Sequence, residues 1–315
     1  MSTFKNKKIW ITGHNGMVGS AILRSLSSES GAHILVASRN ELDLLDVHAV
    51  EAWAFKNRPD FIFHAAAKVG GIYANKIKSA DFIYENLLTQ VNVINVAKKI
   101  DVQKLLFVAT NCTYPGNLIG PIPEDALFSG LPDDAVRAYA VSKLAGIEMC
   151  RAYSRQYGCN FISVIPPNLY GINDNYHPLF GHVVAGILRR AHEAKVSGLS
   201  ELVIWGDGTA RRELLWVDDL ADAMKLLMLS DTKYDLYNIG CGHDWTISDL
   251  TELIVRTVGF KGDIVYDKSK PNGAPRKLLD NTRILSMGWR PSMDEVAGLS
   301  KAYQDFLERL QINAI

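Results

Sequence analysis

Tyr139 and Lys143 are the residues of this chain whose types and spacing predict chemistry most directly. Residues four apart on a helix share one face, so the phenol and the ammonium would lie side by side. A nearby ammonium stabilises a phenolate and lowers the pKa of a tyrosine from its usual value near ~10. Such a tyrosine can exchange a proton with a carbonyl or hydroxyl oxygen near neutral pH. The pair therefore predicts proton transfer at a carbon that bears oxygen.

A glycine-rich loop, Thr12–Gly19, lies between an expected strand and an expected helix. Glycines let the backbone turn sharply and approach a pyrophosphate closely, and the helix N-terminus offers free N–H groups. In this strand–loop–helix context the spacing predicts dinucleotide binding. The residues expected to contact the dinucleotide here are Gly13, Asn15, Gly16, Met17, Val18 and Gly19.

The end of the second expected strand distinguishes NAD from NADP. An acid there would bind a ribose 2′-hydroxyl, whereas an arginine accommodates a 2′-phosphate. The segment Ala37-Ser38-Arg39-Asn40 supplies an arginine, and the acid Glu41 comes slightly later. The sequence therefore favours NADP(H), held in part by Arg39.

Thr110 directly follows the fourth expected strand. Ligands of open α/β sheets bind outside the carboxyl ends of the strands, where a hydroxyl can orient a substrate oxygen toward Tyr139. Taken alone, a hydrogen bond to the local backbone would explain this threonine better. Together with the Tyr–Lys pair and the glycine loop, Thr110 indicates hydride transfer.

These residues need a scaffold of alternating strands and helices. Apolar runs predict strands, and longer amphipathic segments between them predict helices, which is typical of a doubly wound parallel (Rossmann) sheet in an α/β protein. We expect residues 1–168 to form an NADP-binding domain, to which 213–240 return. Residues 169–315 would mainly form a smaller, interleaved C-terminal α/β substrate domain. The expected strands are 8–12, 33–37, 61–65, 104–109, 161–165, 202–205 and 237–239, and the expected helices are 18–26, 50–56, 80–99, 138–157, 182–195, 217–229 and 247–258.

Composition excludes several classes of function. The chain has 315 residues with 34 basic and 34 acidic side chains, so general binding to nucleic acid or to a membrane surface is not expected. No stretch approaches the roughly 20 apolar residues of a membrane span. The four cysteines lack metal-ligand spacing, which favours a reduced, cytoplasmic protein without a bound metal.

The loop, the Tyr–Lys pair and Thr110 resemble the extended short-chain dehydrogenase/reductases. Within that family the chain is similar to the GDP-4-keto-6-deoxy-D-mannose epimerase/reductases, the GDP-L-fucose synthases, over nearly its whole length. The most specific stretches are Asn173-Asp174-Asn175-Tyr176-His177-Pro178 and Lys270-Pro271-Asn272-Gly273-Ala274-Pro275-Arg276-Lys277, supported by Ala65–Ile72 and Asn168–Gly171.

This resemblance implies conversion of a GDP-4-keto-6-deoxy-hexose to GDP-L-fucose or a close relative, by epimerisation at C3 and C5 and then hydride transfer from NADPH to C4. It implies that Cys112 and His182 are the acid and base of epimerisation. It also implies a homodimer formed through 80–99 and 138–157. Further implied contacts are Lys143, Pro166, Asn168, Leu169 and His182 for the cofactor, and Asn168, Arg190, Trp205 and Arg212 for the substrate. The basic residues Arg189, Arg211, Arg276 and Lys277 are additional candidates for phosphate binding.

The chain departs from the family pattern at the sugar end. Thr110-Asn111 replaces two serines, Leu179-Phe180-Gly181 differs, and Asn15 stands where an arginine is common. A C4-reductase with partial or no epimerase activity, a nucleotide-sugar epimerase that recycles its cofactor, and a non-catalytic NADP-binding protein therefore stay open as alternatives. Cys112 stands where a dehydratase would carry an Asp-Glu pair, which counts against dehydration.

Overall fold

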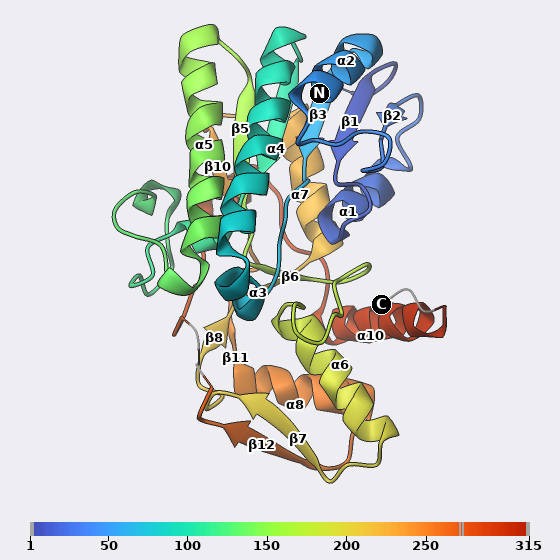
Figure 1. Ribbon diagram of the computed structural model, residues 1–315, viewed down its shortest axis with the longest axis vertical. Helices are drawn as coiled ribbons and strands as arrows, with labels where there is room; N and C mark the ends of the chain where they lie inside the picture. The colour runs from blue at the N-terminus through green and yellow to red at the C-terminus, as the bar shows by residue number, and fades with distance from the viewer. Residues whose placement is uncertain (1–2, 271, 273, 313–315) are drawn as a thin grey trace.

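A six-stranded parallel sheet forms the centre of the larger part of the molecule in the computed structural model, which describes residues 3–270, 272 and 274–312 (Figure 1). All neighbouring strands run parallel, and the strand order reverses between β1 and β3. Ligands of such sheets bind beside this reversal, at the carboxyl ends of the strands. The strands, in sheet order, are β10 (Leu236–Asn238), β5 (Phe161–Ile165), β4 (Lys104–Val108), β3 (Phe61–His64), β1 (Lys8–Thr12) and β2 (His33–Leu35).

Helices cover both faces of this sheet, which confirms the expected doubly wound α/β fold. Along β1, Ile9 and Ile11 belong to one buried cluster and Trp10 to the other, because successive strand residues point to opposite faces. One face packs against α1 (Met17–Leu26) and α7 (Val217–Leu229). The other packs against α2 (Val47–Asn57), α4 (Ser79–Lys99) and α5 (Arg137–Tyr157).

Several elements differ from the expectation, two of them beside the sheet. β2 ends at Leu35, where its pairing with β1 stops opposite Trp10. The chain then turns at Ser38, whose carbonyl accepts the N–H groups of Glu41 and Leu42. A short helix, α3 (Ile72–Ile77), also lies between β3 and α4, where no helix was predicted. Three 3-10 turns are 111–113, 124–126 and 134–136.

A smaller part lies below the sheet in Figure 1 and has its own buried cluster, which includes Leu188, Ile204 and Ile254. Its parallel strand pair is β7 (Glu201–Trp205) with β12 (Asp263–Asp267). The covering helices are α6 (Val183–Val196), α8 (Ile247–Val258) and α10 (Glu295–Gln311). Short pairs complete it: β6 (Asn168–Tyr170) with β9 (Leu214–Trp216), and β8 (Arg211–Arg212) with β11 (Trp245–Thr246).

The chain crosses between these parts more than once. After β5 it enters the smaller part, and it returns through α7, which packs on α1, and β10, which pairs with β5. A two-hydrogen-bond ion pair between Arg24 and Asp218 joins α1 to α7. A later segment again adds to the larger part through α9 (Thr282–Ser286), whose Ile284 is buried in the sheet cluster.

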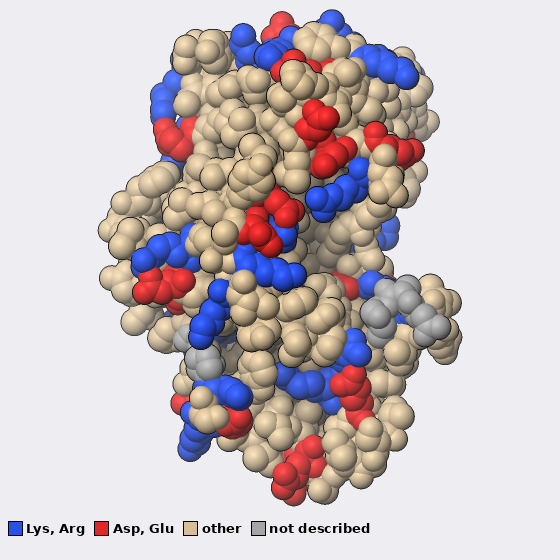
Figure 2. All heavy atoms as spheres, viewed as in Figure 1, with Lys and Arg blue, Asp and Glu red and all other residues tan. Residues whose placement is uncertain are grey.

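Charges of both signs are interspersed over the face shown in Figure 2. This mixture agrees with the equal numbers of acidic and basic residues in the sequence. Among residues 3–270, 272 and 274–312, no helix has the length and apolar character needed to cross a membrane.

Candidate active site

A pocket of about 790 Å³ lies at the carboxyl ends of the sheet strands, where the two parts meet. The pocket brings together residues that are far apart in the sequence and that were each expected to serve the cofactor or the substrate. They are Gly13, Asn15, Gly16, Met17, Val18, Gly19, Arg39, Thr110, Cys112, Tyr139, Lys143, Pro166, Asn168, Leu169, His182, Arg190, Trp205 and Arg212.

The glycine loop has no room for side chains at its two ends. Gly13 has φ of +73°, and a Cβ there would lie 2.7 Å from the Cα of Ala66. A Cβ on Gly19 would lie 2.1 Å from the carbonyl oxygen of Gly13. No side chain caps the N-terminus of α1 at Gly16, which lines the pocket. The free N–H groups of the first helical turn are therefore available to bind a ligand there. This cradle fits a dinucleotide pyrophosphate.

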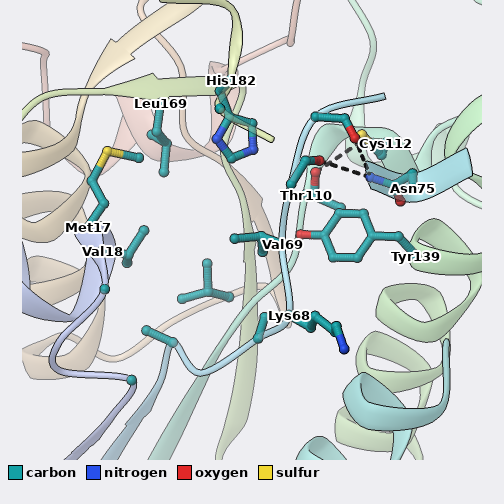
Figure 3. Close-up of a pocket in the computed structure, with 18 of the residues that line it drawn as sticks. Met17, Val18, Lys68, Val69, Asn75, Thr110, Cys112, Tyr139, Leu169 and His182 are labelled. Carbon is teal, nitrogen blue, oxygen red and sulfur yellow. Dashed lines mark hydrogen bonds between the residues drawn. The ribbon is translucent and has the colours of Figure 1, made fainter. Parts of the chain in front are cut away.

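Tyr139 and Thr110 meet at the centre of the pocket. In Figure 3, Tyr139, Thr110 and Cys112 lie on one side and Met17, Val18 and Leu169 on the other. Burial raises the pKa of the Tyr139 phenol, and a hydrogen bond with the Thr110 side chain acts in the opposite direction. The phenol therefore stays protonated at neutral pH and can donate a proton.

Lys143 does not lower the pKa of Tyr139 in this structure, contrary to the prediction from their spacing. Its ammonium donates a hydrogen bond to the carbonyl of Val108 at 2.9 Å and lies 4.7 Å from the ring centre of Phe107. The side chain is 2% exposed, and burial lowers its own pKa to about 7. Helical spacing places both residues on one face of α5, but the end of β4 holds the ammonium.

Cys112 and His182 reach the pocket from different parts of the molecule. Cys112 lies in the turn after β4, where its backbone N–H donates to the Thr110 hydroxyl at 3.3 Å. His182 is the N-cap residue of α6, and in Figure 3 its ring lies between the two groups of side chains. A thiol and an imidazole placed in this way can act on neighbouring carbons of one ligand.

The segment before His182 is tied to the loop after β3. The Phe180 carbonyl accepts the N–H of Gly71 at 3.0 Å. The Phe180 ring stacks on His177 with centroids 4.3 Å apart and faces Tyr73 at 6.4 Å. Leu179 and Tyr73 line the pocket, so the sequence departure at 179–181 forms part of its wall.

Arg190, Trp205 and Arg212 line the substrate end. Arg190 Cζ lies 5.8 Å from the ring centre of Trp205, and its buried Nε has no hydrogen-bond partner among the described residues. Arg212 donates to the carbonyls of Arg211 and Ala274, each at 2.7 Å. Burial lowers the pKa of both guanidinium groups and outweighs the opposing effects of Glu193 on Arg190 and of Asp133 on Arg212. An anionic ligand could accept hydrogen bonds from these buried guanidinium groups and offset their charge.

The other basic candidates are engaged elsewhere. Arg189 forms an ion pair with Glu193 at 2.6 Å. Arg211 and Arg276 share the buried carboxylate of Asp244. Lys277 is buried behind the turn that carries Cys112, with Nζ 3.4 Å from the Asn111 carbonyl oxygen. Pro271 and Gly273 of the same sequence stretch lie outside the described residues.

Several polar or charged pocket residues had no predicted role, among them Lys68, Asn75 and Glu85. Asn75 donates to the carbonyls of Gly70 and Gly71 and lies beside Cys112 in Figure 3. Lys68 follows β3 closely, so its place beyond a strand end was a usable signal. Glu85 lies within α4, and no sequence signal marks it. Glu41, the acid near Arg39, instead accepts hydrogen bonds from the N–H and hydroxyl of Ser38, each at 2.8 Å.

Comparisons with known proteins agree along the whole chain. The sequence profile of the NAD dependent epimerase/dehydratase family matches residues 9–240. A GDP-L-fucose synthase of Sinorhizobium fredii is 46% identical over 313 residues, covering 99% of each chain. A solved GDP-6-OMe-4-keto-L-xylo-heptose reductase from C. jejuni has a TM-score of 0.92 at 30% identity, covering 98% of this chain and 100% of that one. A GDP-L-fucose synthetase from Naegleria fowleri bound to NADP has a TM-score of 0.92 at 25% identity, covering 100% and 97%.

Proposed function

Because this chain belongs to the NAD dependent epimerase/dehydratase family, we propose that it is an NADPH-dependent epimerase/reductase that converts a GDP-4-keto-6-deoxy-hexose to GDP-L-fucose or a close relative. The observation that carries the proposal is the meeting of Tyr139, Cys112 and His182 in one pocket with the glycine cradle. The GDP-L-fucose synthase of Sinorhizobium fredii, similar over 99% of each chain, supports this choice of substrate.

The cradle between Gly13 and Gly19 would hold the pyrophosphate of NADP(H), and Arg39 would face its 2′-phosphate. When bound, this cofactor supplies the hydride for the substrate C4. Met17, Val18 and Leu169 provide an apolar wall opposite Tyr139, where water would be excluded from the reacting carbon (Figure 3).

The C4 ketone of such a sugar acidifies the hydrogens on C3 and C5. Cys112 and His182 would remove and return these protons through an enolate of the sugar, which inverts the two centres. Tyr139 would then donate its proton to the C4 oxygen, because burial keeps the phenol protonated. Thr110 would orient that oxygen from the adjacent turn.

At the other end, Arg190 and Arg212 would bind the diphosphate and Trp205 would contact the substrate beside them. The unpartnered Nε of Arg190 supports this role, since a buried donor without a partner is costly in the absence of an anion. Asn168 lies at the start of β6, between the cofactor end and the substrate end of the pocket.

NADPH oxidation with GDP-4-keto-6-deoxy-D-mannose tests the proposal. We expect one NADPH consumed per sugar, with NMR of the product showing inversion at C3 and C5. An epimerase that recycles its cofactor would leave the NADPH concentration unchanged, and a non-catalytic binding protein would leave both reactants unchanged.

A C4-reductase that does not epimerise is the second candidate. The C. jejuni heptose reductase with a TM-score of 0.92 favours it. The pocket wall at Leu179 also belongs to a segment that differs from the family pattern at the sugar end. This candidate predicts NADPH consumption without solvent deuterium at C3 or C5 of the product.

A homodimer through α4 and α5 is part of the proposal. The two helices lie side by side, and Tyr84, Val91 and Val141 on them are exposed apolar residues. Sedimentation of the wild-type protein beside a Tyr84→Glu variant tests this interface. The cytoplasmic location expected from the cysteine pattern also stays part of the proposal.

A further inference from the structure

A carboxylate on α4 shares the cofactor end of the pocket with two cations. Glu85 lines the pocket together with Arg39 and Lys68. One carboxylate oxygen of Glu85 forms an ion pair with Lys68, and the other lies 4.0 Å from Nη2 of Arg39. Asp81, one helical turn earlier, lies 3.5 Å from Lys68. The Lys68 side chain points along the lower edge of the pocket in Figure 3.

The ion pairs give this end of the pocket a balanced charge rather than a strongly positive one. The hydrogen bond with Glu85 raises the pKa of Lys68, so the lysine carries its full charge at neutral pH. Arg39 has a side-chain exposure of 72%, whereas that of Glu85 is 24%, so the carboxylate is the more fixed of the two. A ligand that approaches Arg39 therefore also approaches a fixed negative charge.

This arrangement acts differently on the two dinucleotides. A 2′-phosphate gains from Arg39 but is repelled by the Glu85 carboxylate. A ribose 2′-hydroxyl carries no charge and can donate a hydrogen bond to a carboxylate. Glu41 does not take this second role, since its carboxylate accepts from Ser38 and does not line the pocket.

We propose that Glu85 is a specificity-determining residue of the cofactor site, which weakens NADPH binding relative to NADH by offsetting the charge of Arg39. The inference rests on the proposed function, because it needs a dinucleotide in the glycine cradle with its ribose at Arg39.

Dissociation constants of NADPH and NADH, measured by titration of the protein without sugar substrate, test the inference. Glu85→Gln keeps the size and hydrogen-bonding groups of the side chain but removes its charge. We expect it to tighten NADPH binding by about threefold to tenfold at low salt and to leave NADH binding within about twofold. The gain should shrink at about 0.5 M salt, where charges several ångströms apart are screened.

Asp81→Asn is the matched control, because it removes one acid from α4 that also pairs with Lys68 but does not line the pocket. Its ratio of NADH to NADPH dissociation constants should stay within about twofold of wild type, since an exposed charge outside the pocket is well screened. Glu85→Asp, which keeps the charge, should also retain the wild-type ratio. Thermal melting of each variant verifies that it is folded.

An unchanged ratio in Glu85→Gln, with NADPH still bound by the wild type, overturns the inference and leaves the proposed function standing. An Arg39→Ala variant that binds NADPH as well as wild type also overturns it, because the phosphate would then lie elsewhere. If the wild type binds neither dinucleotide, the proposed function fails and the inference fails with it.

Discussion

The ammonium of Lys143 donates to the carbonyl of Val108 across the interface between α5 and β4. This bond keeps a cation in a site where it is 2% exposed, and burial lowers its pKa to about 7. In the unfolded chain the pKa of a lysine is about 10.4. Between these two values the unfolded state binds more protons than the folded state.

The free energy of unfolding should therefore depend on pH through Lys143. The burial penalty is fully present below pH 7 and is relieved as the pH rises toward 10, so the stability of the wild type relative to Lys143→Met should increase by about 1 kcal/mol per pH unit in that window. Urea unfolding of both proteins between pH 7 and 9.5 measures this difference. A constant difference would mean that Lys143 keeps its charge in the folded protein.

Tyr139→Phe removes the expected proton donor but keeps the ring that meets Phe82 edge-on at 6.1 Å. We expect C4 reduction to fall by about 10²-fold or more, since general acid catalysis typically contributes that much. NADPH affinity should stay within about threefold. Single-turnover rates and dissociation constants measure the two effects. Turnover at the wild-type rate would remove the proton-donor role.

The sequence predicted the sheet well because its strands are buried on both faces. Ile9 to Ile11 and Leu105 to Val108 are continuous apolar runs, which are typical of parallel strands buried on both faces. The residues after these strands were then expected to meet at one edge of the sheet, and Thr110 and the glycine loop do line one pocket. The topology of parallel strands makes this edge predictable from sequence order alone.

Side-chain direction and long-range pairing were not predictable in the same way. The spacing of Tyr139 and Lys143 was correct for a helix, but the choice between the phenol and the Val108 carbonyl depends on packing against β4. Glu85 on α4 meets Arg39 in the loop after β2 only through the tertiary fold, and neither segment carries a pattern that signals this contact. Strands of two residues, such as β8 and β11, are too short to show alternation.

Cys112→Ser separates epimerisation from reduction. A serine hydroxyl is far less acidic than a thiol, so proton removal by this residue should be lost. We expect solvent deuterium to stop entering at C3 and C5, while a sugar that is already epimerised is reduced at a rate within about threefold of wild type. NMR of the product formed in D₂O measures both the deuterium at C3 and C5 and the extent of reduction. Deuterium entry at the wild-type rate would show that the Cys112 thiol is structural.

Phe180 should position His182 without touching the substrate. Phe180 lies two residues before His182. Its ring stacks on His177 with centroids 4.3 Å apart, and its carbonyl accepts a hydrogen bond from the N–H of Gly71. Phe180→Ala removes the stacked ring, so the α6 N-terminus should lose its fixed place and deuterium exchange should fall about tenfold more than reduction of the epimerised sugar. Phe180→Tyr keeps the ring and should restore the wild-type ratio. Equal losses in both reactions would assign Phe180 a general structural role.

Arg190 should strengthen ligand binding without adding to the free energy of unfolding of the ligand-free protein. Its Nε is buried without a partner among the described residues, and burial lowers its pKa. Arg190→Met replaces this charge by an apolar chain of similar length, so the free energy of unfolding should change by less than about 1 kcal/mol or increase. The same variant should bind GDP about 10²-fold more weakly, because a charge-assisted hydrogen bond to the diphosphate is lost.

Arg189→Met is the control for this last pair of measurements, since Arg189 is the adjacent residue on α6 and pairs with Glu193 outside the pocket. Its GDP affinity should match wild type by calorimetry. Its free energy of unfolding should fall by about 1 to 2 kcal/mol, because the ion pair with Glu193 and a hydrogen bond to the Tyr176 carbonyl are both lost. If Arg190→Met instead unfolds readily while GDP binding is preserved, Arg190 serves the core of the smaller part, and the diphosphate must be held elsewhere, with Arg212 the remaining pocket arginine at that end.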